Sequence, residues 1–115
     1  MNEFFKNATE IKVEGATLPF YKFSEDGVEY IGFDSRKCVP PEPMVNALVA
    51  LNLIADSKSK VMMINHHYPV ALIPKIEHSY DISHEKLEGE EVKVIISLKE
   101  GASAQTLDTN VKCGG

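Results

Sequence analysis

The chain has 115 residues and a formal net charge of -5 at pH 7. This length suits a single domain with its own core, and the acidic balance argues against general nucleic-acid binding. No segment approaches the roughly 20 consecutive apolar residues that span a bilayer, and the acidic N-terminus lacks the apolar stretch of a secretory signal, so we expect a cytoplasmic protein that does not bind membranes.

The N-terminal part of the sequence predicts β-structure ahead of the core. After a frayed or briefly helical start at residues 1–7, residues 10–14 alternate weakly and predict an edge strand. Residues 18–23 and 28–33 are strand-like on either side of an Asp-Gly pair, which is typical of a tight hairpin turn. We therefore expect residues 10–29 to form a hairpin extension that adds strands to the sheet.

A strand that ends at Phe33 leads through a short polar connection into an apolar helix. Pro40 and Pro41 cannot donate to a sheet ladder, so the strand must end before them, whereas the first turn of a helix tolerates proline. Glu42 then places negative charge near the positive end of the helix dipole. We predict a helix over residues 41–55, whose N-terminus suits an anion or a thiol of lowered pKa.

The predicted helix over residues 41–55 is apolar almost all round. Val45, Val49 and Leu53 lie off its main apolar face, although a helix on one face of a sheet needs only one apolar stripe. Either the N-terminal hairpin covers the second stripe, or a second subunit does. A homodimer through this helix is therefore one of two alternatives.

A second junction follows the same pattern later in the chain. The continuous apolar run Val61–Ile64 predicts a central strand covered on both faces, with its two methionines in the core. Asn65–Tyr68 forms the loop, and a proline then opens a helix predicted over residues 69–78. Pro74 lies inside this helix and is expected to kink or shorten it.

Residues 80–87 and 92–99 are predicted to form two strands joined by a turn, and residues 101–115 are predicted to form a flexible tail. The fold class is therefore predicted to be α+β: a two-layer α/β sandwich with a β-α-β-α-β-β core and both helices on one face of a mixed sheet. We expect a single domain over residues 1–100, with its core at residues 30–99.

The two junctions are expected to meet at one edge of the sheet. The strands before them are joined through a helix, so they should be parallel, with a right-handed crossover, and ligands of α/β sheets favour the edge at their carboxyl ends. The helix N-termini are expected to make this edge electropositive. Eight residues form the candidate functional edge: Asp34, Arg36, Cys38, Pro40, Glu42, Asn65, His66 and His67.

Structural roles compete with functional ones at the first junction. Asp34 and Arg36 either orient a ligand or, as we favour, hold the loop, with Asp34 accepting backbone N–H bonds and Arg36 pairing with Glu42. Cys38 is either a thiol activated by the neighbouring basic residues or a half-buried loop residue, and we favour the second interpretation.

Cys38 and His67 are the candidate metal ligands, with help from His66 or Cys113, and mixed nitrogen and sulfur ligands suit zinc or copper. Because adjacent histidines on an extended chain point apart, at most one is expected to face the site, and we choose His67. Its alternative role is a bond to the backbone at a helix start. Cys113 is interpreted as a thiol on the flexible tail.

The order Asp-x-Arg-x-x-x-Pro-Pro-Glu-Pro at residues 34–43, ahead of an apolar helix, resembles the TusA/SirA-like superfamily over roughly residues 30–99. Sulfur carriers of that superfamily place a reactive cysteine in a Cys-Pro-x-Pro motif before the first helix, and Pro40 stands in that position here. The chain looks more like an uncharacterised sister family, often found beside hemerythrin domains, that also lacks this cysteine. Its Asn-x-His-x-Pro-x-x-Leu motif is matched by Asn65, His67, Pro69 and Leu72.

Three hypotheses of function remain. The resemblance implies a small binding or carrier-like module that acts through a protein partner in sulfur or redox metabolism. The first alternative is a metal- or redox-responsive protein that uses Cys38 and His67. The second, ranked lowest because Pro40 fills the sulfur-bearing position, is a persulfide carrier through Cys38. The sequence contains no recognisable catalytic constellation, which favours a role other than that of an enzyme.

Overall fold

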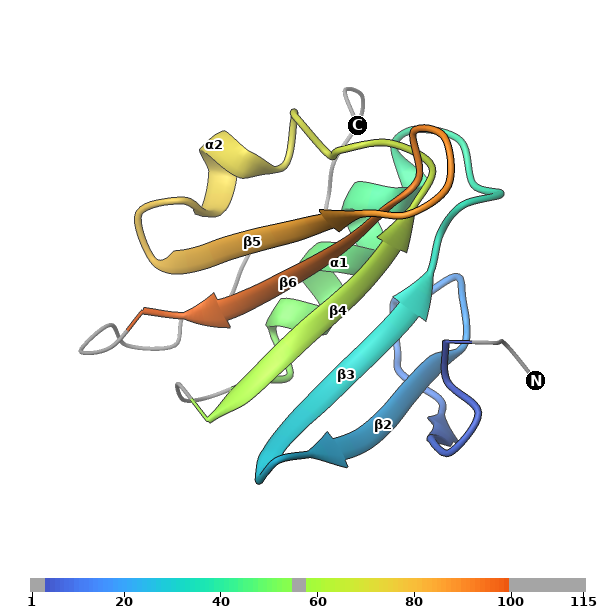
Figure 1. Cartoon of the computed structure of the whole chain (residues 1–115), viewed down its shortest axis with the longest axis vertical. Coiled ribbons are helices and arrows are strands. Elements are labelled where there is room, and N and C mark those ends of the chain that lie inside the picture. Colours follow the sequence, from blue (N-terminus) through green and yellow to red (C-terminus); the bar gives the residue numbers. More distant parts are fainter. Residues whose placement is uncertain (1–3, 55–57, 100–115) are drawn as a thin grey trace.

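A computed structural model describes residues 4–54 and 58–99 (Figure 1). These residues form a six-stranded sheet with the order β1-β2-β3-β4-β6-β5. Strands β3 and β4 pair in parallel, and the other neighbouring pairs are antiparallel. The elements are β1 (Thr9–Ile11), β2 (Phe20–Glu25), β3 (Val28–Asp34), α1 (Glu42–Leu51), β4 (Ser59–Asn65), α2 (Ile73–Ile76), β5 (Tyr80–Lys86) and β6 (Val92–Leu98).

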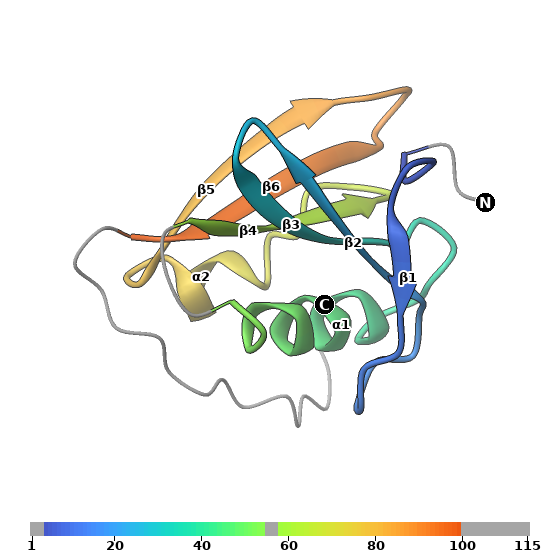
Figure 2. The same cartoon turned by 90° about the horizontal axis from the view of Figure 1, so that it is seen from below.

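The predicted α+β fold is confirmed. From β3 to β6 the elements follow the order β-α-β-α-β-β, and Figure 2 shows α1 and α2 on the same side of the curled sheet. The parallel pair β3 and β4 is joined through α1, so both of these strands end at the same edge. This arrangement brings the two junctions together.

The predicted hairpin is also confirmed. Strands β2 and β3 are joined by Asp26 and Gly27, and Glu25 pairs with Val28 across the turn. Asp26 has a φ of 54° and Gly27 a φ of 80°. Two successive positive φ angles are what a two-residue turn of type I′ requires, and the twist of this turn matches that of the strands.

Both helices are shorter than predicted. Helix α1 ends at Leu51, and α2 has only four residues. The bounds predicted for this helix, residues 69–78, were wrong, whereas the shortening expected from Pro74 is confirmed. Pro74 does not kink a helix that is already under way. It lies in the first turn of α2, where its missing N–H has no intrahelical partner to lose. Of the described helices, none is long and apolar enough to cross a membrane.

Alternating side chains of β4 supply both faces of the sheet. Val61 and Met63 belong to the main core beneath the helices, whereas Met62 and Ile64 pack on the opposite face with Phe5. All four strand residues are buried, which confirms the prediction of a central strand covered on both sides. Phe5 is 1% exposed, so the expectation of a frayed N-terminal start is wrong at this residue.

The segment between β1 and β2 covers the outer side of α1. The side-chain amide of Asn46 donates to Thr17 Oγ1 at 2.8 Å, and its Oδ1 accepts the Thr17 N–H at 2.9 Å. Four apolar side chains of this region pack against the core: Ile11, Val13, Ala16 and Leu18. Cover from the same chain therefore accounts for Val45 and Val49, whereas Leu53 is 44% exposed, and the homodimer through this helix stays a prediction.

Candidate functional site

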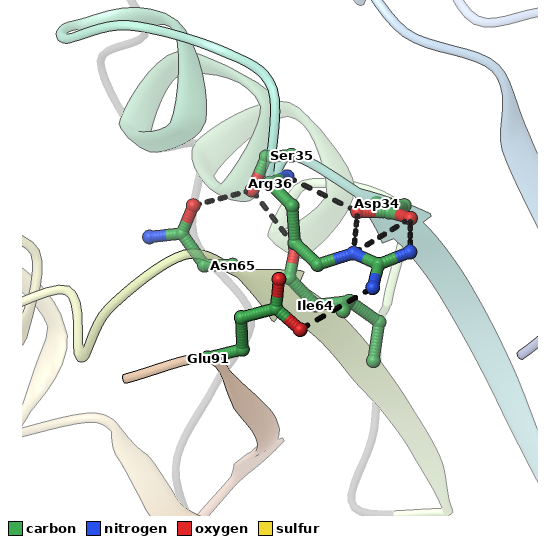
Figure 3. Close-up of polar contacts among 6 residues, drawn as sticks. All are labelled: Asp34, Ser35, Arg36, Ile64, Asn65 and Glu91. Atoms are coloured by element: carbon green, nitrogen blue, oxygen red, sulfur yellow. Dashed lines mark hydrogen bonds and ion pairs between the residues drawn. The ribbon is translucent and has the colours of Figure 1, made fainter. Parts of the chain in front are cut away.

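The two junctions are joined directly at one edge of the sheet (Figure 3). The backbone N–H of Ser35 donates to the carbonyl oxygen of Ile64 at 2.7 Å. The Ser35 hydroxyl lies 3.0 Å from the same oxygen and 2.9 Å from Asn65 Oδ1. The Asn65 amide in turn donates to the carbonyl of His67 at 3.0 Å. Ser35 and Asn65 are fully buried, so this connection is shielded from water.

Arg36 is held by carboxylates on two sides. Its Nη2 lies 2.7 Å from Asp34 Oδ2, its Nε lies 3.0 Å from Asp34 Oδ1, and its Nη1 reaches Glu91 Oε1 at 3.4 Å (Figure 3). The hydrogen bonds to Asp34 are the main reason why the pKa of Arg36 is raised. The backbone N–H of Arg36 also donates to Asp34 Oδ1, which confirms the predicted loop-holding role of Asp34.

The predicted pairing of Arg36 with Glu42 is wrong, because Arg36 turns toward the loop between β5 and β6, where Glu91 lies. Glu42 instead accepts a hydrogen bond from the hydroxyl of Thr17. Its carboxylate is in the first turn of α1, where the helix dipole favours negative charge. The N-terminus of α1 therefore already has an anionic group supplied by the chain itself.

The thiol of Cys38 is deactivated. Burial raises its pKa to about 11, and the charge of Glu42, a hydrogen bond to Glu42 and the charge of Asp34 act in the same direction. Burial, with the nearby Glu42 and Asp34, therefore favours the interpretation of Cys38 as a half-buried loop residue over that of a thiol activated by basic neighbours. At neutral pH the residue is a protonated thiol, a poor nucleophile and a poor metal ligand.

An open pocket of about 500 Å³ lies beside Cys38. This volume is within the range of small-ligand sites. Residues of the first junction line one side of the pocket, and residues around the start of β2 line the other. The lining includes Leu18, Tyr21, Asp34, Arg36, Cys38 and Glu42. Four of the eight residues proposed for the functional edge thus share one pocket.

The second junction lines a different pocket. His67 and Tyr68 face a smaller opening of about 200 Å³ together with His84, Lys86 and Glu90. The ring of Tyr68 lies 4.6 Å from that of His84, so this loop packs on β5. The structure therefore brings both junctions to one edge but places Cys38 and His67 on separate pockets.

His66 and His67 do not point apart. Their ring centroids are 4.2 Å apart in an edge-to-face arrangement, because β4 ends at Asn65 and strand alternation no longer applies. His67 Nδ1 lies 2.9 Å from the carbonyl oxygen of Tyr68, which requires a proton on Nδ1. His66 Nδ1 is buried and has no hydrogen-bond partner among the described residues.

Within residues 4–54 and 58–99, no three His, Cys, Asp or Glu side chains are grouped so as to hold a metal ion. Cys113, the further ligand suggested by the sequence, lies outside the described residues. Zinc or copper binding by Cys38 and His67 therefore stays a prediction.

Sequence reasoning missed three contributors to this edge. Ser35 is a small polar residue in a polar loop and carries no distinguishing pattern. Glu91 is separated from Arg36 by 55 positions, so no local spacing links them. Tyr21 belongs to a hairpin that was assigned only a sheet-extending role, although it lines the larger pocket.

Comparison with known proteins gives no relative from which to assign a family. No family model matches the sequence, and no curated protein and no solved structure matches it. The likeness to the TusA/SirA-like superfamily thus stays a prediction that rests on the motifs at the two junctions.

Proposed function

We propose that the chain is a small TusA/SirA-like binding module that acts through a protein partner and not by turnover. The observation that carries this proposal is the exposure of apolar side chains at both junctions. Val39, ahead of α1, is 70% exposed, and Val70, ahead of α2, is 68% exposed. Among the described residues only Leu53 is a further exposed large apolar side chain, at 44%.

The rigidity of the edge supports a docking role. The hydrogen bonds among Ser35, Ile64 and Asn65 tie the two loops together, and the ion pair of Arg36 with Asp34 stiffens the first of them. A surface whose shape is fixed before binding loses less conformational entropy on association. Exposed apolar side chains on such a surface contribute favourably when a partner removes them from water.

The chemistry of Cys38 favours this role over sulfur transfer. A persulfide carrier needs a thiolate, and the pKa of this thiol is raised to about 11. Pro40 stands where carriers of the resembled superfamily have their cysteine. Both features support a module that binds without carrying sulfur, whose partner belongs, by the resemblance, to sulfur or redox metabolism.

Capture from native extract with matched variants tests the proposal. Immobilised wild-type chain is expected to retain a specific protein that V39S/V70S loses and L53S keeps, because Leu53 lies beyond the C-terminal end of α1, whereas Val39 lies ahead of its N-terminal end. Circular dichroism should show that both variants keep the wild-type fold. Retention of the same proteins by all three chains, or of none by the wild type, contradicts docking at this edge.

A further inference from the structure

The pocket of about 500 Å³ beside Cys38 has an apolar wall and a polar wall. Leu18, Pro19 and Tyr21, around the start of β2, form the apolar wall. The ring of Tyr21 is held in place, because it stacks on the ring of Phe5 with centroids 4.8 Å apart. This wall therefore has its shape before a ligand arrives, and it suits the hydrocarbon part of a small molecule.

Glu42 supplies an anionic group to the polar wall. It lies in the first turn of α1, and its carboxylate accepts hydrogen bonds from the Thr17 hydroxyl and the Cys38 thiol. Because an ionised carboxylate has about four acceptor positions, these donors orient the group and leave further positions for a ligand. Within residues 4–54 and 58–99, Glu42 forms no ion pair with a basic side chain, so no cation of this part of the chain offsets its charge.

The two basic residues that line the pocket are used elsewhere or lie at its rim. Arg36 binds both carboxylate oxygens of Asp34 and reaches Glu91 with a further nitrogen, so these carboxylates offset its charge. Lys37 is exposed to solvent, which places it at the open side of the pocket. The charge that remains in the interior is therefore that of Glu42.

Cys38 reports the sign of the electrostatic field in this interior. Burial is the largest cause of its raised pKa, and the charge of Glu42, a hydrogen bond to Glu42 and the charge of Asp34 follow. Nearby negative charge raises the pKa of a thiol because it disfavours the thiolate. The interior of the pocket is thus negative, although two basic residues line it.

We infer that this pocket binds a small organic ammonium ion, whose ammonium group pairs with Glu42 and whose hydrocarbon part lies against Leu18 and Tyr21. Hydrogen bonds between ionised partners are among the strongest that proteins form. Amines and amino acids share this chemistry, and Lys37 distinguishes them, because only an amino acid carries a carboxylate for the rim. The inference goes beyond the protein docking of the proposed function, whose exposed valines are not among the lining residues.

Three probes with one hydrocarbon body test the pocket on the full chain: phenylalanine, 2-phenylethylamine, which lacks its carboxylate, and 3-phenylpropanoate, which lacks its amino group. The two ammonium probes should shift the amide NMR signals of Leu18, Tyr21 and Cys38 in the wild type. Their Kd should be on the order of 1–10 mM, as suits ligands of this size. The probe that lacks the amino group should leave these signals unchanged.

Matched variants connect the binding to one carboxylate. E42Q keeps the shape of the side chain and removes its charge, so it should weaken both ammonium probes about tenfold or more. E77Q removes the same charge at the exposed end of α2 and should leave binding unchanged, and circular dichroism verifies the fold of both variants. K37Q identifies the source of the ligand: it weakens phenylalanine alone if the site serves amino acids, and it strengthens 2-phenylethylamine if the site serves amines.

An absence of shifts at the pocket with both ammonium probes overturns the inference. Binding of 3-phenylpropanoate as tight as that of the ammonium probes also overturns it, because the ammonium group would then contribute nothing. Equal binding by E42Q and E77Q has the same consequence, since the charge of Glu42 would not hold the ligand. If E42Q does not fold, the probe series on the wild type decides, because it needs no variant.

Discussion

The two junctions follow parallel strands and end at the same edge, yet their ionisable side chains are used differently. At the first, Asp34 and Arg36 form a network with Glu91, and their side chains are only 16% and 24% exposed. At the second, His66 Nδ1 is buried without a partner in the described part of the chain. Similar positions in the topology have therefore led to an ion-pair network at the first junction and to one unpaired buried nitrogen at the second.

We expect the polar groups of the first junction to be required for folding, and His66 at the second junction not to be. The polar groups of the first junction hold a loop that must turn from β3 into α1 through consecutive prolines, so their removal should weaken the fold. The second junction is held by the Asn65 amide and by the packing of Tyr68 on His84, so its histidine at position 66 is dispensable for folding. Removal of the Arg36 or Ser35 side chain should consequently lower the stability of the fold, whereas replacement of His66 by an apolar ring should raise it.

The largest effect is expected from R36A. It leaves Asp34 and Glu91 without their shared cation and removes the contact of Arg36 with Phe4. Breaking a well-shielded, bidentate pair costs about 2–3 kcal/mol, measured as the free energy of unfolding in urea. R36K keeps the positive charge but not the planar guanidinium that binds both carboxylate oxygens. Its free energy of unfolding should therefore fall by about half as much. A loss below roughly 0.5 kcal/mol in R36A, typical of an exposed pair, would contradict a structural role.

A smaller loss is expected from S35A, which removes the hydroxyl between the two junctions. Ile64 keeps its backbone bond from Ser35, but Asn65 Oδ1 loses a buried donor. An unsatisfied buried acceptor costs about 1–2 kcal/mol, again by urea unfolding. S24A is a matched control, because Ser24 is exposed in β2. This substitution should change the free energy of unfolding by less than about 0.5 kcal/mol. Equal effects of the two substitutions would mean that Ser35 does not tie the loops.

The third test measures the reactivity of Cys38. Because alkylation requires the thiolate, its rate at this residue, followed by peptide mass spectrometry, should rise about tenfold per pH unit until the pH approaches 11. E42Q removes the negative charge that helps to raise this pKa, so it should speed alkylation several-fold at pH 8. Fast alkylation of the wild type at neutral pH would refute the deactivated thiol.

The same shift has a consequence for stability. The folded chain holds the Cys38 proton more tightly than the unfolded chain, since the pKa rises from 9.0 to about 11 on folding. The contribution of this proton to the free energy of unfolding is therefore complete below about pH 9 and is lost as the pH rises toward 11. C38A should remove this part of the alkaline decline in the free energy of unfolding.

Local patterns were enough to predict much of the fold. The Asp-Gly turn, the alternating strands and the apolar run of β4 each depend on neighbours in sequence, and the right-handed crossover rule then fixed the shared edge. The length of α2 was misjudged because Pro74 suits both a kink inside a helix and a first turn, and the local pattern does not distinguish the two.

The chemistry of the edge was less predictable, because it depends on contacts between distant residues. Asp34 was assigned correctly, since its partner is the N–H two residues away. The partner of Arg36 lies 55 positions along the chain, and the state of Cys38 depends on burial and on Glu42. The burial of Phe5 was missed for the same reason, because nothing near Phe5 in the sequence indicates that Gly32 leaves space for its ring.

The smallest expected change in the free energy of unfolding comes from a substitution at the second junction, and it is an increase where the others are decreases. H66F keeps a ring of similar size against His67 at 4.2 Å and removes a buried nitrogen that has no partner in residues 4–54 and 58–99. Because an unpaired buried polar atom is costly, the free energy of unfolding should rise by up to about 1 kcal/mol. H67F instead loses the hydrogen bond from Nδ1 to the carbonyl of Tyr68. Its free energy of unfolding should therefore be lower than that of the wild type by about 0.5–1 kcal/mol. Thermal and urea unfolding of both variants under the same buffer conditions measures the two effects. If H66F is the more destabilised of the two, His66 is part of a satisfied network after all, and the contrast between the two junctions no longer holds.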